Sequence, residues 1–164
     1  MLLRYLALGP FFIVVAFATI PAGASVAGNP CAVVTRSDAS TALGAAASAG
    51  FAVGANRTNV SLGAPVTGPK VECRYRASTG TVDITVHIYA NAKAQYQRER
   101  TSWSPIVDLS GIGDAAFYEG GSGIYGLKGN TLFFVSLNFK RRIANPRSPY
   151  PQLVTLAKIA ASRL

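Results

Sequence analysis

Hydrophobic and polar residues alternate most regularly between residues 81 and 89 of the chain. Val82, Ile84, Val86 and Ile88 are separated by Asp83, Thr85, His87 and Tyr89. This period of two predicts a β-strand with one buried face. Residues 71–77 predict a strand that forms a hairpin with it through residues 78–80. Further strands are predicted over residues 115–119, 124–127 and 131–139, with a poorer one near 51–53, and residues 106–113 are predicted to be a loop.

Three other segments show helical spacing. Thr35 and Asp38 fit a capping box and Gly44 suits a helix end, which predicts a helix over residues 36–43. Asn91 is a suitable N-cap for a second helix that runs to about residue 100. From Pro151 onward a third helix is predicted, because small and aliphatic residues fall on one helical face. These residues are Leu153, Leu156, Ala157, Ala160, Ala161 and Leu164.

The order of these elements predicts an α+β fold. Strands that follow one another through tight turns favour an antiparallel sheet, and amphipathic helices must cover apolar surface. We expect about five strands with two or three helices packed on one face, and a possible duplicated half, because a helix followed by strands occurs twice. Residues 31–164 are expected to form a single domain after a flexible N-terminus at 25–30.

The first 24 residues have the pattern of a secretory signal peptide. Arg4 gives a positive start, residues 6–20 are apolar, and Ala22-Gly23-Ala24 places small residues before a cleavage point at Ser25. The apolar run is short and contains Pro10, so a permanent membrane anchor is the alternative. We therefore expect a secreted or periplasmic protein.

Two cysteines, Cys31 and Cys73, remain after the leader. An even pair in an exported chain predicts one disulfide bond, which would tie the start of the domain to its first long strand. The alternative, a reactive or metal-binding thiol pair, has neither a CxxC spacing nor histidines nearby. No metal site and no cofactor are predicted.

The charge of the chain is concentrated near its end. Residues 25–119 hold eight basic and seven acidic residues, whereas residues 120–164 hold seven basic residues and no acid. This asymmetry favours an anionic membrane, an anionic envelope polymer or an acidic protein partner, and the alternative is a solvated face that aids solubility. The candidate binding residues are Lys140, Arg141, Arg142 and Arg147. Although arginine and aromatic residues interleave at 74–76 and 139–142, an exported chain without a recognised binding signature is not expected to bind nucleic acid.

The candidate catalytic residues stand apart from one another in the sequence. His87 is the single histidine, and Asp83 lies about 13 Å along the same strand, too far to orient it. Asp108, Asp114 and Glu119 could supply paired carboxylates only at a defined separation in a cleft. Gly111, Gly113 and Asp114 lie in a GxGxxA pattern that follows a loop instead of a strand, which favours a structural turn over a nucleotide site.

Three motifs carry a family resemblance. They are residues 29–35 (NPCAVVT), 72–75 (ECRY) and 111–118 (GIGDAAFY). Their order resembles that of small uncharacterised bacterial envelope domains, many of them actinobacterial-type lipoproteins, and similar layouts occur in extracellular sensor domains of bacterial kinases. The resemblance spans residues 29–164 and implies no catalytic residues. The chain departs from the lipoprotein pattern because no acylation cysteine stands at the cleavage point.

Together these observations predict an exported, noncatalytic envelope protein that binds a small ligand, an anionic envelope polymer or a protein partner. The alternative is a small secreted hydrolase that uses Asp114 or His87.

Overall fold

The computed structural model describes residues 29–53, 71–88, 91–141, 145 and 147–164. In chain order the elements are α1 (Pro30–Val33), α2 (Arg36–Leu43), β1 (Phe51–Val53), β2 (Val71–Arg76), β3 (Gly80–Ile88), α3 (Ala92–Ser102), β4 (Val107–Leu109), β5 (Ala115–Tyr118), β6 (Gly123–Lys128), β7 (Thr131–Phe139) and α4 (Pro151–Arg163).

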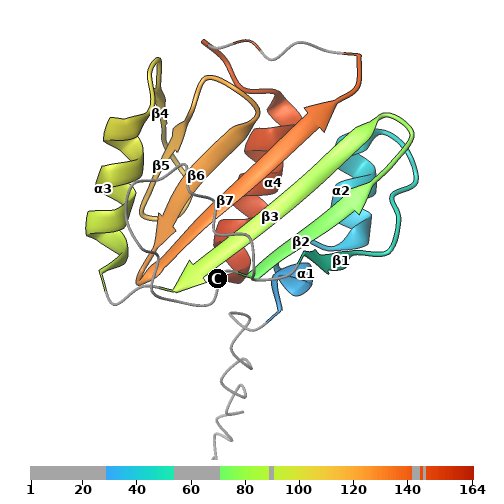
Figure 1. The fold of residues 1–164 in the computed structure, drawn as a ribbon, viewed down its shortest axis with the longest axis horizontal. Helices are drawn as coiled ribbons and strands as arrows, with labels where there is room; N and C mark the ends of the chain where they lie inside the picture. Colours follow the sequence, from blue (N-terminus) through green and yellow to red (C-terminus); the bar gives the residue numbers. More distant parts are fainter. Residues whose placement is uncertain (1–28, 54–70, 89–90, 142–144, 146) are drawn as a thin grey trace, which may run out of the picture.

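The strands form one antiparallel sheet in the order β1-β2-β3-β7-β6-β5-β4 (Figure 1). The two longest strands, β3 and β7, pair along their whole length at its centre, from Gly80 opposite Phe139 to Ile88 opposite Thr131. Each neighbouring pair on either side is also antiparallel. The α+β prediction with an antiparallel sheet is therefore confirmed.

Three helices cover one face of this sheet, which we call the first face. α4 lies across β6 and β7, while α1 and α2 cover β2 and β3, and in Figure 1 these helices stand behind the sheet. Alternate residues of the central strands are fully buried against them, including Ile84, Val135 and Leu137. The aliphatic face of α4 that the spacing predicts supplies Leu153 and Leu156 to this core.

α3 packs on the opposite face, which we call the second face. Its buried residues, Ala92, Gln95, Tyr96 and Glu99, recur at helical spacing. Tyr96 meets Phe117 of β5 edge to face, with ring centroids 5.4 Å apart. Leu127 and Leu132 complete this smaller apolar cluster.

One detail of the predicted architecture is wrong. The described sheet has seven strands, not about five, because Phe51–Val53 pairs with β2 and because Val107–Leu109, predicted as loop, pairs with β5. Of the three predicted helices, α2 and α4 share the first face, whereas α3 lies on the second face. Strands β5 and β6 are consequently buried on both sides, and their residues do not alternate between apolar and polar.

The start of the described chain is fixed to the first face. Cys31 and Cys73 lie at disulfide distance, with Cα atoms 5.2 Å apart, which is compatible with the predicted bond. The Tyr75 hydroxyl donates to the carbonyl of Val34 at 2.5 Å.

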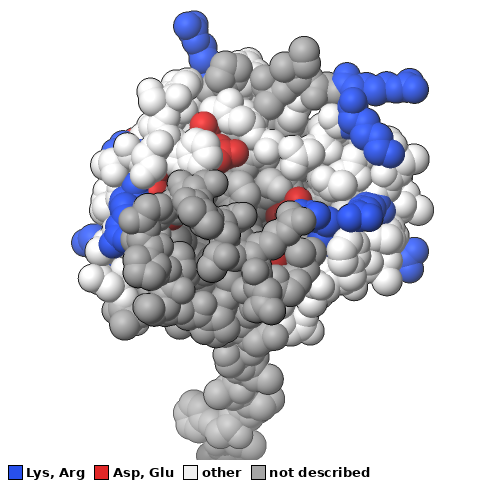
Figure 2. Space-filling view, in the orientation of Figure 1, with Lys and Arg blue, Asp and Glu red and all other residues white. Residues whose placement is uncertain are grey.

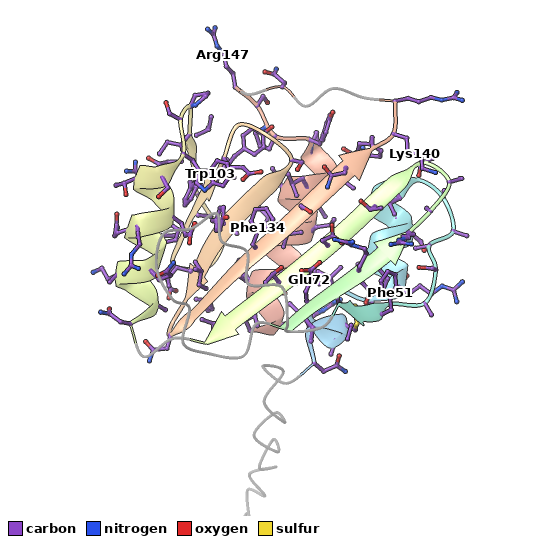
Figure 3. The ribbon with its side chains drawn as sticks, in the orientation of Figure 1. Phe51, Glu72, Trp103, Phe134, Lys140 and Arg147 are labelled. Carbon is purple, nitrogen blue, oxygen red and sulfur yellow. A yellow bond between two sulfur atoms is a disulfide. The ribbon has the colours of Figure 1, made fainter. Side chains whose placement is uncertain are left out.

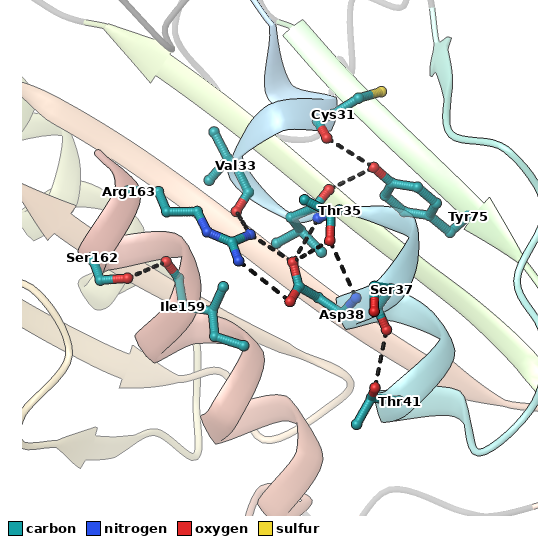
Figure 4. Close-up of polar contacts among 11 residues, drawn as sticks. Cys31, Val33, Thr35, Ser37, Asp38, Thr41, Tyr75, Ile159, Ser162 and Arg163 are labelled. Carbon is teal, nitrogen blue, oxygen red and sulfur yellow. Dashed lines mark hydrogen bonds and ion pairs between the residues drawn. The ribbon is translucent and has the colours of Figure 1, made fainter. Parts of the chain in front are cut away.

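Asp38 connects the two ends of the described domain. It completes the predicted capping box with Thr35 and accepts a hydrogen bond from Arg163 of α4 at 2.6 Å (Figure 4). Burial opposes ionisation of Asp38, but hydrogen bonds from Arg163 and Thr35 outweigh it and hold the pKa of this carboxyl below its ordinary value. This contact ties α4 to the beginning of α2.

Among the described residues, no helix is both long enough and apolar enough to cross a membrane. The predicted signal peptide and flexible N-terminus, residues 1–28, lie outside the described part of the chain.

Candidate functional site

Three of the predicted anion-binding residues, Lys140, Arg141 and Arg147, lie at one end of the molecule, which we call the basic end, with Arg147 apart from Lys140 (Figure 3). All three are exposed in the segment between β7 and α4. Lys140 and Arg147 stand at the end of the sheet opposite α1 and the C-terminus (Figures 1 and 3), and basic side chains project there into solvent (Figure 2). Arg142, the fourth predicted residue, lies outside the described residues.

Elsewhere in the described structure some basic residues are paired with carboxylates, and others, such as Lys93, Arg98 and Lys158, are not. Arg74 contacts Glu72 at 3.1 Å and Asp83 at 2.5 Å. Arg100 binds Asp108 through two hydrogen bonds. The basic end has no ion pair with any described residue. No acid follows Glu119 in the sequence, and in the described structure the acids that precede it pair with Lys128 and Arg163 of residues 120–164 but not with the basic end.

The predicted turn lies between β4 and β5. Gly111 and Gly113 have φ of 72° and 58°, a region that residues with a Cβ rarely occupy. The Asp114 backbone N–H donates to the carbonyl of Leu127 at 2.8 Å, and its carboxylate accepts the Gly129 N–H at 2.7 Å. Asp114 thereby joins this turn to the β6–β7 hairpin.

The candidate catalytic acids have separate local contacts. Asp114 is exposed, and the Gly129 N–H lowers the pKa of its carboxyl, which opposes a role as a general acid at neutral pH. Asp108 is held by Arg100, which lowers the pKa of Asp108 in the same way. Burial raises the pKa of Glu119, whose carboxylate accepts the backbone N–H of Ser122. The side chain of His87 is outside the described residues.

The second face carries a polar network that the sequence pattern did not predict. Arg74 bridges Glu72 and Asp83, and the Ser136 hydroxyl lies 3.5 Å from the other oxygen of Asp83. The interleaved Arg74-Tyr75-Arg76 stretch is thus divided between the faces: the two arginines lie on the second face, whereas Tyr75 is buried in the core of the first. The alternation of side chains along a strand could have predicted that Tyr75 and the two arginines lie on opposite faces. It could not have predicted which residues of β3 and β7 belong to the network.

A row of aromatic rings lies beside this network and also was not predicted. Tyr125 stacks on Phe117 at 5.1 Å and contacts Phe134 at 4.5 Å, measured between ring centroids. Trp103, the residue that ends α3, lies 6.4 Å from Tyr125 and is 38% exposed (Figure 3). The available sequence signal was a single tryptophan directly after a helix.

Glu99 lies on α3 next to this row and is only 3% exposed. Its Oε1 accepts a hydrogen bond from the Gln95 side chain at 2.8 Å, while its Oε2 has no hydrogen-bond partner in the described structure. Burial raises the pKa of Glu99, and hydrogen bonding from Gln95 and Trp103 opposes this rise.

No family model matches this chain, and no curated protein or solved structure matches it either.

Proposed function

We propose that this chain is an exported, noncatalytic protein whose basic end binds an anionic polymer of the cell envelope. The observation that carries the proposal is the position of three exposed basic residues at one end of the molecule without a carboxylate partner in the described structure (Figure 3). Lys140, Arg141 and Arg147 are exposed and have no carboxylate partner among the described residues. Unpaired surface charges of one sign attract an oppositely charged chain, and salt screens the attraction.

The position of the basic end favours a polymer over the membrane surface. α1, where the described chain begins, and Lys140 lie at opposite ends of the molecule (Figures 1 and 3). If the leader were kept as a membrane anchor, which is the alternative to cleavage, the basic end would therefore face away from that membrane. A wall polymer or another extended polyanion could still reach it.

The alternative hydrolase receives less support from the described geometry. The Asp114 carboxylate accepts a hydrogen bond from the Gly129 N–H, which lowers its pKa and favours the ionised form. Asp108 accepts hydrogen bonds from Arg100, and Glu119 accepts the backbone N–H of Ser122 in the β5–β6 turn. A general acid must hold a proton at the working pH. Among the described side chains, the carboxyls with a raised pKa are Glu119 and Glu99, and the candidate Asp114 is not one of them.

Retention of the purified protein on immobilised linear polyphosphate, with neutral dextran as the control matrix, tests the proposal. The triple variant Lys140→Ser/Arg141→Ser/Arg147→Ser should bind about tenfold more weakly at low salt, because each charge near an anionic surface contributes about 1 kcal/mol at most.

A matched control variant removes the same charge elsewhere. Lys93, Arg98 and Lys158 are exposed and form no ion pair with the described residues. Their replacement by serine should change retention less than the first variant does. Equal retention of both variants and the unmodified protein would show that the basic end serves solubility alone.

A further inference from the structure

We propose that Trp103, Tyr125 and the Glu99 carboxyl group form a binding site for a neutral saccharide ring on the second face. This site goes beyond the proposed function, because it lies on α3 and β6 and uses none of the residues of the basic end. The two sites also differ in physical character, since one relies on charge and the other on stacking and hydrogen bonds.

The aromatic half of the site is a supported platform. Tyr125 is held from below by Phe117, whose ring lies nearly parallel to it at 16°, and from the side by Phe134. Trp103 extends this platform toward solvent and is one of two large hydrophobic side chains that are more than a third exposed in the described structure. An exposed indole on a rigid aromatic base offers a flat apolar surface, on which the C–H face of a sugar ring can stack.

The polar half of the site is the incomplete hydrogen bonding of Glu99. A buried carboxyl oxygen without a partner costs about 1–3 kcal/mol, so such an atom calls for a hydrogen bond from elsewhere. Glu99 lies one helical turn before Trp103 and interacts with its indole. Oε2 is buried, so binding at the proposed site requires that the Trp103 side chain moves when a ligand stacks on it, which lets a hydroxyl group of the ligand donate to Oε2.

Charge narrows the ligand to a neutral one. The net charge of +9 disfavours a cation at long range. An anion would meet the Glu99 carboxyl, and the nearby Arg100 is already bound to Asp108. A ring that is apolar on one side and carries hydroxyl groups at its edge satisfies both halves of the site without a net charge.

The chain provides its own probe for this site, because Trp103 is its single tryptophan. Titration of the purified protein with the tetramer of N-acetylglucosamine, and separately with a neutral galactan oligomer, should shift the tryptophan emission to saturation for at least one of them. Binding should be unchanged between about 50 and 300 mM salt, unlike that of the basic end. Absence of an emission change and of calorimetric heat up to about 10 mM of both saccharides would overturn the proposal.

Variants then assign the binding to these residues. By calorimetry, Trp103→Ala should weaken saccharide binding at least tenfold, and Glu99→Gln should weaken it by a smaller factor because the amide retains part of the hydrogen bonding. Phe51→Ala is the matched control: Phe51 is 39% exposed on the same face, but at the β1 edge beside Arg76. Equal binding by Trp103→Ala and Phe51→Ala, with both variants folded by circular dichroism, would also overturn the site.

Discussion

On the first face of the sheet, three helices bury a continuous apolar core, whereas on the second face α3 covers a small aromatic cluster beside charged side chains. β7 contributes to both faces with adjacent residues. Phe133 is fully buried in the larger core, and Phe134 is only partly buried among the rings of the second face. The first face therefore supplies most of the folding energy, which leaves the second face free to carry groups that are costly to bury.

The largest expected effect is a loss of stability on replacing Phe133, compared with its neighbour Phe134. Phe133→Ala should lower the free energy of unfolding by about 3–5 kcal/mol, because it removes a fully buried ring and leaves a cavity. Phe134→Ala should cost clearly less, since its ring is already partly exposed. Chemical denaturation of both variants measures the difference. Equal losses would mean that the two faces contribute alike to stability.

The two faces can also be compared on β2, where Cys73 of the predicted disulfide bond lies on the first face and Arg76 on the second. Replacing both Cys31 and Cys73 by alanine should lower the free energy of unfolding by about 3–4 kcal/mol, because the bond closes a loop across a sequence separation of 42 residues. Arg76→Ser, on the second face of the same strand, should cost less than about 1 kcal/mol, the usual value of an exposed cation–π contact. Unfolding by urea under oxidising conditions provides both values. A cost below that of Arg76→Ser for the cysteine variant would contradict a structural bond.

The smallest effect concerns the pH dependence of the second face. Burial raises the folded-state pKa of Glu99, so folding binds a proton. Its stabilising contribution is complete below the unfolded pKa of about 4.3 and is lost as the pH rises through the folded value. Glu99→Gln stays neutral at every pH and should therefore be more stable than the unmodified protein at pH 7, by about 1 kcal/mol.

The difference between the two proteins should vanish near pH 4, which thermal unfolding at a series of pH values can measure. Asp38 has the opposite linkage: its pKa is lowered, so its contribution is present above the unfolded pKa and is lost as the pH falls. Since both proteins retain Asp38, its effect cancels in the comparison. A difference that does not vary with pH would show that Glu99 does not change its protonation between the folded and unfolded states.

Local signals in the sequence were sufficient to predict several elements. The capping box of Thr35 and Asp38, the left-handed Gly44 and the start of α4 at Pro151 all appear at the predicted positions, because each depends on residues within one or two turns of helix. The alternation in residues 81–88 likewise predicted β3. Charge asymmetry is a property of composition, so the bases of the basic end could be named from the sequence alone, although their grouping at one end of the molecule could not.

Tertiary packing set which face each helix covers and which distant residues meet. α3 has a mixed surface that includes Gln95 and Glu99 on its buried side, and no local rule assigns such a helix to a face. β4 has only three residues and is a strand solely because β5 lies beside it. The contacts among Trp103, Tyr125 and Glu99 depend on the placement of α3 over the sheet. Contacts between separate elements are set by packing of the whole domain and not by spacing along the chain.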